Sequence, residues 1–101
     1  MLDVTRAFGL NLLFPERDEV IGKALKDHGE FAPAELAFIA EHLNKAGREG
    51  AFIDVGANIG AISLPLSRGR ESWRFIAVEA HRGLAQILST NAFGNGLYHV
   101  E

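Results

Sequence analysis

Two acidic residues lie at the ends of short apolar segments, and the first of them leads into a glycine-rich turn. Asp54 falls in the run "AFIDV", and Gly56, Asn58 and Gly60 follow at alternating positions. Glu79 ends a second apolar run, "RFIAVE", 19 residues after Gly60. Glycine lets a ligand approach the backbone closely because it has no Cβ. A carboxylate placed like Glu79 can accept hydrogen bonds from both hydroxyls of a ribose, and Asp54 can hold positive charge, directly or through water.

The spacing of the turn restricts the ligand. A dinucleotide turn has the pattern G-x-G-x-x-G, and a phosphate-cradling P-loop ends in Lys-Ser or Lys-Thr. This turn has neither pattern, since Ala57 is flanked by one glycine only and no lysine follows. A ligand with a ribose and a cationic or amino group but no phosphate remains, and S-adenosylmethionine (SAM) fits that description. In the simpler interpretation, the glycines only connect a strand to a helix, and Asp54 and Glu79 only cap helices.

The elements that must hold these residues follow from the hydrophobic pattern. Short apolar runs predict strands, and apolar stripes with capping residues predict helices. From residue 50 we expect strand, helix, strand, helix and the start of a third strand, at 51–55, 59–68, 74–79, 82–93 and 97–101. This order predicts an α/β fold with parallel strands and crossover helices. Strands that are apolar at nearly every position fit a sheet covered on both faces.

Pro65 conflicts with the first crossover helix, because proline six residues into a helix should kink it or force a late start. Upstream, residues 4–14 predict one extended strand or a short ribbon that ends at Pro15. Two helices should follow: one at 18–29, capped by Asp18 and stopped by Gly29, and one at 32–47. We divide the chain into a β segment with a helical lead-in at 1–49 and a βαβαβ part at 50–101.

Composition excludes several classes of function. The chain has 101 residues, no cysteine and a formal net charge of −3. It therefore has no disulfide or thiolate metal site, and without a basic run we expect no nucleic-acid partner. We also expect no membrane span. The N-terminal segment carries Asp3 where a secretory signal would be basic, so we expect a cytoplasmic protein.

The sequence resembles a known family. The stretches "FIDVGANIGAISLPLS" and "FIAVEAHRGLAQILSTNAFGN", and upstream "DEVIGKALKDHGEFAPAELAFIAEHL", are similar to FkbM-type SAM-dependent methyltransferases of the class I, Rossmann-like group. The resemblance covers about residues 8 to 101, and "DVGANIG" is its most specific part. One departure is Ala80, where the family usually has proline after the acidic residue.

The resemblance implies methyl transfer from SAM, usually to a hydroxyl oxygen of a small metabolite, sugar or lipid-like acceptor. It implies that Asp54, Gly56, Ala57, Asn58 and Gly60 line the methionine and ribose side of the cofactor. It further implies that Glu79 binds the ribose hydroxyls, that Ala80 and His81 border the adenine, and that Glu30 and Phe31 close over the cofactor.

The resemblance also implies what this segment lacks. Strands beyond the third, which face the acceptor in the family, are not in the sequence, so we expect a truncated cofactor-binding portion that is incomplete for catalysis, without an assignable catalytic base. An open strand edge would then invite self-association. The alternative functions are a non-catalytic interaction module that pairs through this edge and, less favoured by the glycine spacing, an NAD-binding half-domain.

Other polar residues have simpler explanations. No histidine has metal-ligand spacing, and Ser63 lacks the context of a nucleophile, so we set it aside. Asn91 and Asn95 match the family, yet helix-end and turn roles explain them.

Overall fold

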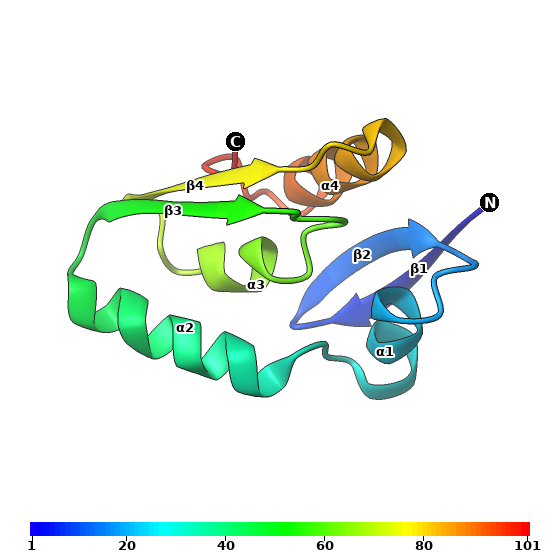
Figure 1. The fold of residues 1–101 in the computed structure, drawn as a ribbon, viewed down its shortest axis with the longest axis horizontal. Coiled ribbons are helices and arrows are strands. Elements are labelled where there is room, and N and C mark those ends of the chain that lie inside the picture. The colour runs from blue at the N-terminus through cyan, green and yellow to red at the C-terminus, as the bar shows by residue number, and fades with distance from the viewer.

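The computed structural model describes residues 1–101 as an α/β domain with two small sheets and four helices (Figure 1). The elements follow in the order β1 (Leu2–Ala7), β2 (Leu10–Pro15), α1 (Ile21–His28), α2 (Pro33–Ala46), β3 (Gly50–Val55), α3 (Ser63–Ser67), β4 (Trp73–Val78) and α4 (Arg82–Gly94). No helix in it has the length and apolar character needed to cross a membrane.

The N-terminal segment is a ribbon, the second of the two forms that the sequence predicts. β1 and β2 pair in antiparallel register, with Ala7 opposite Leu10. The two residues between them, Phe8 and Gly9, both have positive φ, as a tight hairpin turn requires. Arg68 donates a hydrogen bond to the Phe8 carbonyl, which fixes the turn against the segment after α3.

β3 and β4 form the predicted parallel pair, with Phe52 opposite Phe75 and Val55 opposite Val78. Only a single parallel bridge, between Phe75 and Val100, continues the sheet. The expected third strand from residue 97 is therefore wrong in extent. The Leu97 N–H bonds the Ala92 carbonyl and the Val100 N–H bonds the Leu97 carbonyl, so this segment is a turn until its last residues reach β4.

Asp18, the predicted cap of the first upstream helix, lies two residues before the observed N-cap, Val20, whose side chain makes no capping bond. Asp18 Oδ1 accepts hydrogen bonds from the N–H groups of Val20 and Ile21 at 3.0 and 2.9 Å. Gly29 ends α1 in the left-handed conformation, and Pro33 occupies the first position of α2. α2 thus begins and ends within one residue of the prediction, and α1 ends where predicted but begins three residues later than Asp18.

The first crossover helix differs from the prediction. It was expected from residue 59, but α3 has five residues and begins at Ser63. Residues 57–62 are used in a turn, in which the Gly60 N–H bonds the Ala57 carbonyl. Pro65 thus lies in the first turn of the helix, where its missing N–H has no consequence. Of the two outcomes that proline allowed, the late start is observed.

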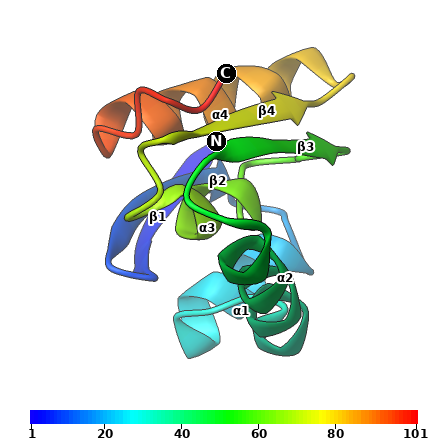
Figure 2. The ribbon, with the colours of Figure 1, turned by 90° about the vertical axis from the view of Figure 1, so that its left-hand side faces the viewer.

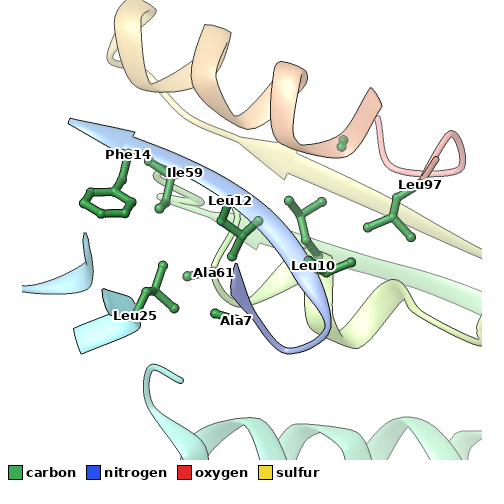
Figure 3. Packing of buried hydrophobic residues seen from close by; sticks show 10 residues of the cluster. Ala7, Leu10, Leu12, Phe14, Leu25, Ile59, Ala61 and Leu97 are labelled. Atoms are coloured by element: carbon green, nitrogen blue, oxygen red, sulfur yellow. The ribbon is translucent and has the colours of Figure 1, made fainter. Parts of the chain in front are cut away.

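Two clusters of buried side chains hold the fold. The main cluster joins one face of the hairpin to residues after β3 and within α4, and Figure 3 shows Leu10, Leu12 and Phe14 along β2 with Ile59 and Leu25 around them. The smaller cluster joins Leu66 of α3 to Trp73 and Phe75 of β4, and α2 packs against it. Figures 1 and 2 show α2 and α3 on the same side of β3.

The opposite face of the parallel pair is open, contrary to the expectation of a sheet covered on both faces. Side chains alternate between the faces of a strand, and four of the five apolar ones on this face are exposed: Ala51, Ile53 by 60%, Val55 by 80% and Val78 by 47%. The fifth, Ile76, is half-buried. Every helix that packs on the pair does so from the face that carries Phe52 and Phe75.

Candidate functional site

The two acidic residues lie at the carboxyl ends of the neighbouring strands β3 and β4. Asp54 pairs with Ala77 in the parallel register, and Glu79 follows directly after the last residue of β4. Ligands of open α/β sheets bind beyond the carboxyl ends of the strands. The structure therefore brings Asp54 and Glu79 together where a ligand would approach.

The glycine turn is tied to the end of β4. The N–H groups of Gly56 and Ala57 both bond the Val78 carbonyl, at 2.8 and 3.0 Å. The next N–H, that of Asn58, donates to Glu79 Oε1 at 2.8 Å. Three successive N–H groups thus face β4 and the residue after it, and the turn lies directly beside the Glu79 carboxylate.

The two glycines of the turn have different surroundings. Both have positive φ, +79° for Gly56 and +95° for Gly60. A Cβ on Gly56 would meet no atom within 4 Å, whereas a Cβ on Gly60 would lie 2.8 Å from Leu64. Gly60 therefore lets the start of the helix pack against the turn, while Gly56 leaves open space in which a ligand can contact the backbone.

Glu79 is held in its ionised form. Oε1 accepts from Asn58 and Oε2 accepts from the His81 N–H at 2.8 Å. The bonds from His81 and then Asn58 hold the pKa of the Glu79 carboxyl below its ordinary value. A carboxylate has about four lone-pair positions, so two further hydrogen bonds from a ligand can be accepted beside the two from the backbone. Glu79 does not cap α4, because His81 does so by accepting from the Leu84 N–H.

Ser63, which has no sequence context of a functional residue, lies beside Asp54. It is fully buried and its hydroxyl donates to Asp54 Oδ2 at 2.6 Å. This bond fixes the half-buried Asp54 side chain and leaves Oδ1 for a ligand. The late start of α3 puts Ser63 in reach of Asp54, and the position of Pro65 was the one feature of the sequence that pointed to that start.

Asn58 carries an unsatisfied polar atom. It has φ +55°, a left-handed conformation that asparagine tolerates. Its Oδ1 is buried and accepts no hydrogen bond. Asn58 also lines a hollow of about 490 Å³ that lies between the start of α1, at Asp18 and Ile21, and Leu84 of α4. Small-molecule pockets usually measure about 300–1,000 Å³, so the hollow is of ligand size, and Asn58 is the one predicted site residue that lines it.

The remaining predicted site residues differ in burial and in whether they contact the glycine turn. Ala57 is buried under the turn, while Ala80 and His81 are exposed between β4 and α4. Phe31 packs against the main cluster, to which Ile59 of the turn belongs. Glu30 is exposed and makes no hydrogen bond to the turn, so the structure does not bring it to the site.

These geometric features make the turn and its two carboxylates the candidate site. Two carboxylates with unused acceptor positions border an open backbone turn, and no three His, Asp or Glu side chains gather as metal ligands. Comparison of the chain with models of protein families and with curated proteins finds no match.

Proposed function

We propose that this chain carries the cofactor site of an S-adenosylmethionine-dependent methyltransferase with a Rossmann-like half-fold. The observation that supports this most is the pair formed by the open turn at Gly56 and the ionised Glu79 beside it. Ribose hydroxyls are hydrogen-bond donors that fit the free acceptor positions of Glu79. Asp54, held by Ser63, offers its free Oδ1 to the ammonium or sulfonium group.

The residues present fit SAM better than a phosphate-bearing cofactor. The N–H groups of Gly56, Ala57 and Asn58 are already bonded to Val78 and Glu79. They are not free to cradle a phosphate, as the N–H groups of a pyrophosphate turn do. SAM supplies an activated methyl group when it is bound. The acceptor class, a hydroxyl of a small metabolite, sugar or lipid-like molecule, is proposed on the resemblance to FkbM-type enzymes.

Calorimetric titration with S-adenosylhomocysteine tests the proposal. We expect binding by the wild-type chain, with chemical-shift changes at Gly56 and Glu79, and no binding of NAD. Glu79→Ala should weaken the affinity by at least about tenfold, because hydrogen bonds to a charged group contribute about 1.5–3 kcal/mol each. Glu35→Ala, which removes an exposed carboxylate on α2, is the matched control. A folded sample that gives neither heat nor shifts would rule out cofactor binding.

A second candidate function rests on a separate observation. No backbone group of β3 on the edge away from β4 has a hydrogen-bond partner, and exposed Ile53 and Val55 lie along that strand. Such an edge can pair with another chain, as in an interaction module without catalytic activity. Sedimentation distinguishes the two: an obligate dimer that ignores S-adenosylhomocysteine favours the module, and a monomer that binds it favours the methyltransferase site.

A further inference from the structure

Asn91 makes a set of buried hydrogen bonds that the proposed site does not yet use. It lies within α4 and is only 2% exposed. Its Oδ1 accepts from the Leu13 N–H at 2.8 Å, and its Nδ2 donates to the Leu13 carbonyl at 3.0 Å. The same Nδ2 donates to the Ile59 carbonyl, also at 3.0 Å. One side chain therefore bonds both the hairpin and the glycine turn.

Asn95 repeats half of this arrangement. Its Oδ1 accepts from the Asn11 N–H at 2.9 Å, and its Nδ2 donates to the Asn11 carbonyl at 2.8 Å. Residues four apart on a helix are separated by about 6 Å along its axis, and alternate residues of a strand by about 6.6–6.8 Å. The spacing of the two amides therefore matches the spacing of Asn11 and Leu13, the two residues of β2 that they bond. Only Asn91 continues to the glycine turn, since Asn95 donates its second bond to the carbonyl of Asn91.

The bond to Ile59 is the second hydrogen bond on the Ile59–Gly60 peptide, whose N–H already bonds the Ala57 carbonyl within the turn. Ile59 precedes Gly60, which has no Cβ to restrict the backbone. On the other side of Ile59, the Asn58 N–H is held by Glu79. The segment from Asn58 to Gly60 is thus held by a carboxylate at its first N–H, by the Asn91 amide at the Ile59 carbonyl, and by the bond from the Gly60 N–H to the Ala57 carbonyl within the turn. If the amide is removed, the Ile59 carbonyl loses its bond to the core, and the bonds of Asn58 and Gly60 remain.

We propose that Asn91 is a positioning residue of the cofactor site, which holds the glycine turn in its binding conformation by bonding the Ile59 carbonyl while it anchors the turn to the hairpin. This inference rests on the proposed SAM site for its effect on affinity. The link to the turn can be tested without any ligand. Asn91 and Asn95 bond β2 in the same way, and their second bonds go to the Ile59 carbonyl and to the Asn91 carbonyl, so Asn95, which is half-buried, serves as the control.

The experiment compares Asn91→Ala with Asn95→Ala. In ligand-free protein, amide hydrogen exchange at Asn58 and Gly60 should become faster in Asn91→Ala and stay as in the wild type in Asn95→Ala. Affinity for S-adenosylhomocysteine, measured where both variants are folded, should fall about tenfold in the first, the loss expected for one buried hydrogen bond, and change less than about twofold in the second. Equal exchange and equal affinity in the two variants would overturn the proposal.

A measurement on the wild type covers the case in which Asn91→Ala does not fold. The side-chain amide resonances of Asn91 should shift when S-adenosylhomocysteine is added, and those of Asn95 should not. If both or neither shift while the compound binds, Asn91 has no special link to the site. If the wild type does not bind the compound, the proposed function fails. The exchange contrast, or without it slow exchange of both Asn91 side-chain amide protons in the wild type, still decides whether Asn91 holds the turn from the core.

Discussion

At the scale of single residues, substitutions at Gly56 and Gly60 should affect ligand affinity and folding stability to different extents. An alanine at either position must adopt a left-handed backbone, which costs about 1–2 kcal/mol. At Gly60 the new methyl group would also collide with Leu64, at 2.8 Å. We expect Gly60→Ala to lower the free energy of unfolding by about 3 kcal/mol, and Gly56→Ala by about 1 kcal/mol.

We expect the same pair to have the opposite order in the loss of ligand affinity. The Gly56 position opens onto free space, so a methyl group there would occupy the place of the ligand. Urea unfolding and calorimetric titration with S-adenosylhomocysteine, applied to both variants, measure the two effects. If Gly56→Ala binds as well as the wild type does, the ligand does not lie over this glycine.

Glu79 gives a prediction about pH. Its pKa is lowered from 4.5 in the folded protein, so the unfolded chain binds the proton more tightly. The carboxylate therefore stabilises the fold above pH 4.5, and this contribution is lost as the pH falls through the lower folded pKa. Wild type should be more stable than Glu79→Gln near neutral pH, and the difference should decrease steadily in acid. Chemical unfolding at a series of pH values checks it; parallel curves for the two proteins would contradict the assignment.

At the scale of elements, the sequence predicts the helices and strands that are marked by residues within or next to them. Asp18, Gly29 and Pro33 mark the ends of α1 and α2, and the apolar runs mark β3 and β4. The start of α3 depends instead on the turn that precedes it. Contacts between residues far apart in the chain have no local signal at all, as with Asn91, which bonds Leu13 from 78 positions away. The carboxylates and glycines of the site were therefore predictable, and the residues that support them were not.

The hairpin offers an element-scale prediction, because only one of its faces contributes to the core. Leu12 of β2 is fully buried in the main cluster, whereas Val4 of β1 is 56% exposed. We expect Leu12→Ala to lower the free energy of unfolding by about 3 kcal/mol, and Val4→Ala by less than about 0.5 kcal/mol. Thermal unfolding of both variants provides the measurement. Similar losses would mean that the hairpin is not anchored through this face.

At the scale of the whole molecule, the parallel pair is covered on one face and open along one edge. The free edge of β3 has no charge on its exposed face, no proline and no bulge, which are the usual protections of an edge strand. A second copy could pair with it in antiparallel fashion about Ile53. Ile53 would then face its own copy, Ala51 would face Val55, and Asp54 would face Phe52, so that the acidic side chains are not directly opposed.

This register predicts the effect of a charge on β3. Ile53→Lys would place two like charges opposite each other across the dimer, which is destabilising in a strand pair. We expect wild type to associate with increasing concentration in sedimentation equilibrium and Ile53→Lys to remain monomeric under the same conditions. Phe38→Lys is the control, because Phe38 of α2 is exposed to a similar extent, 63%, and lies away from the β3 edge. If both variants lose association, the contact depends on exposed apolar side chains in general and not on β3. A wild type that stays monomeric would exclude pairing through β3 at those concentrations.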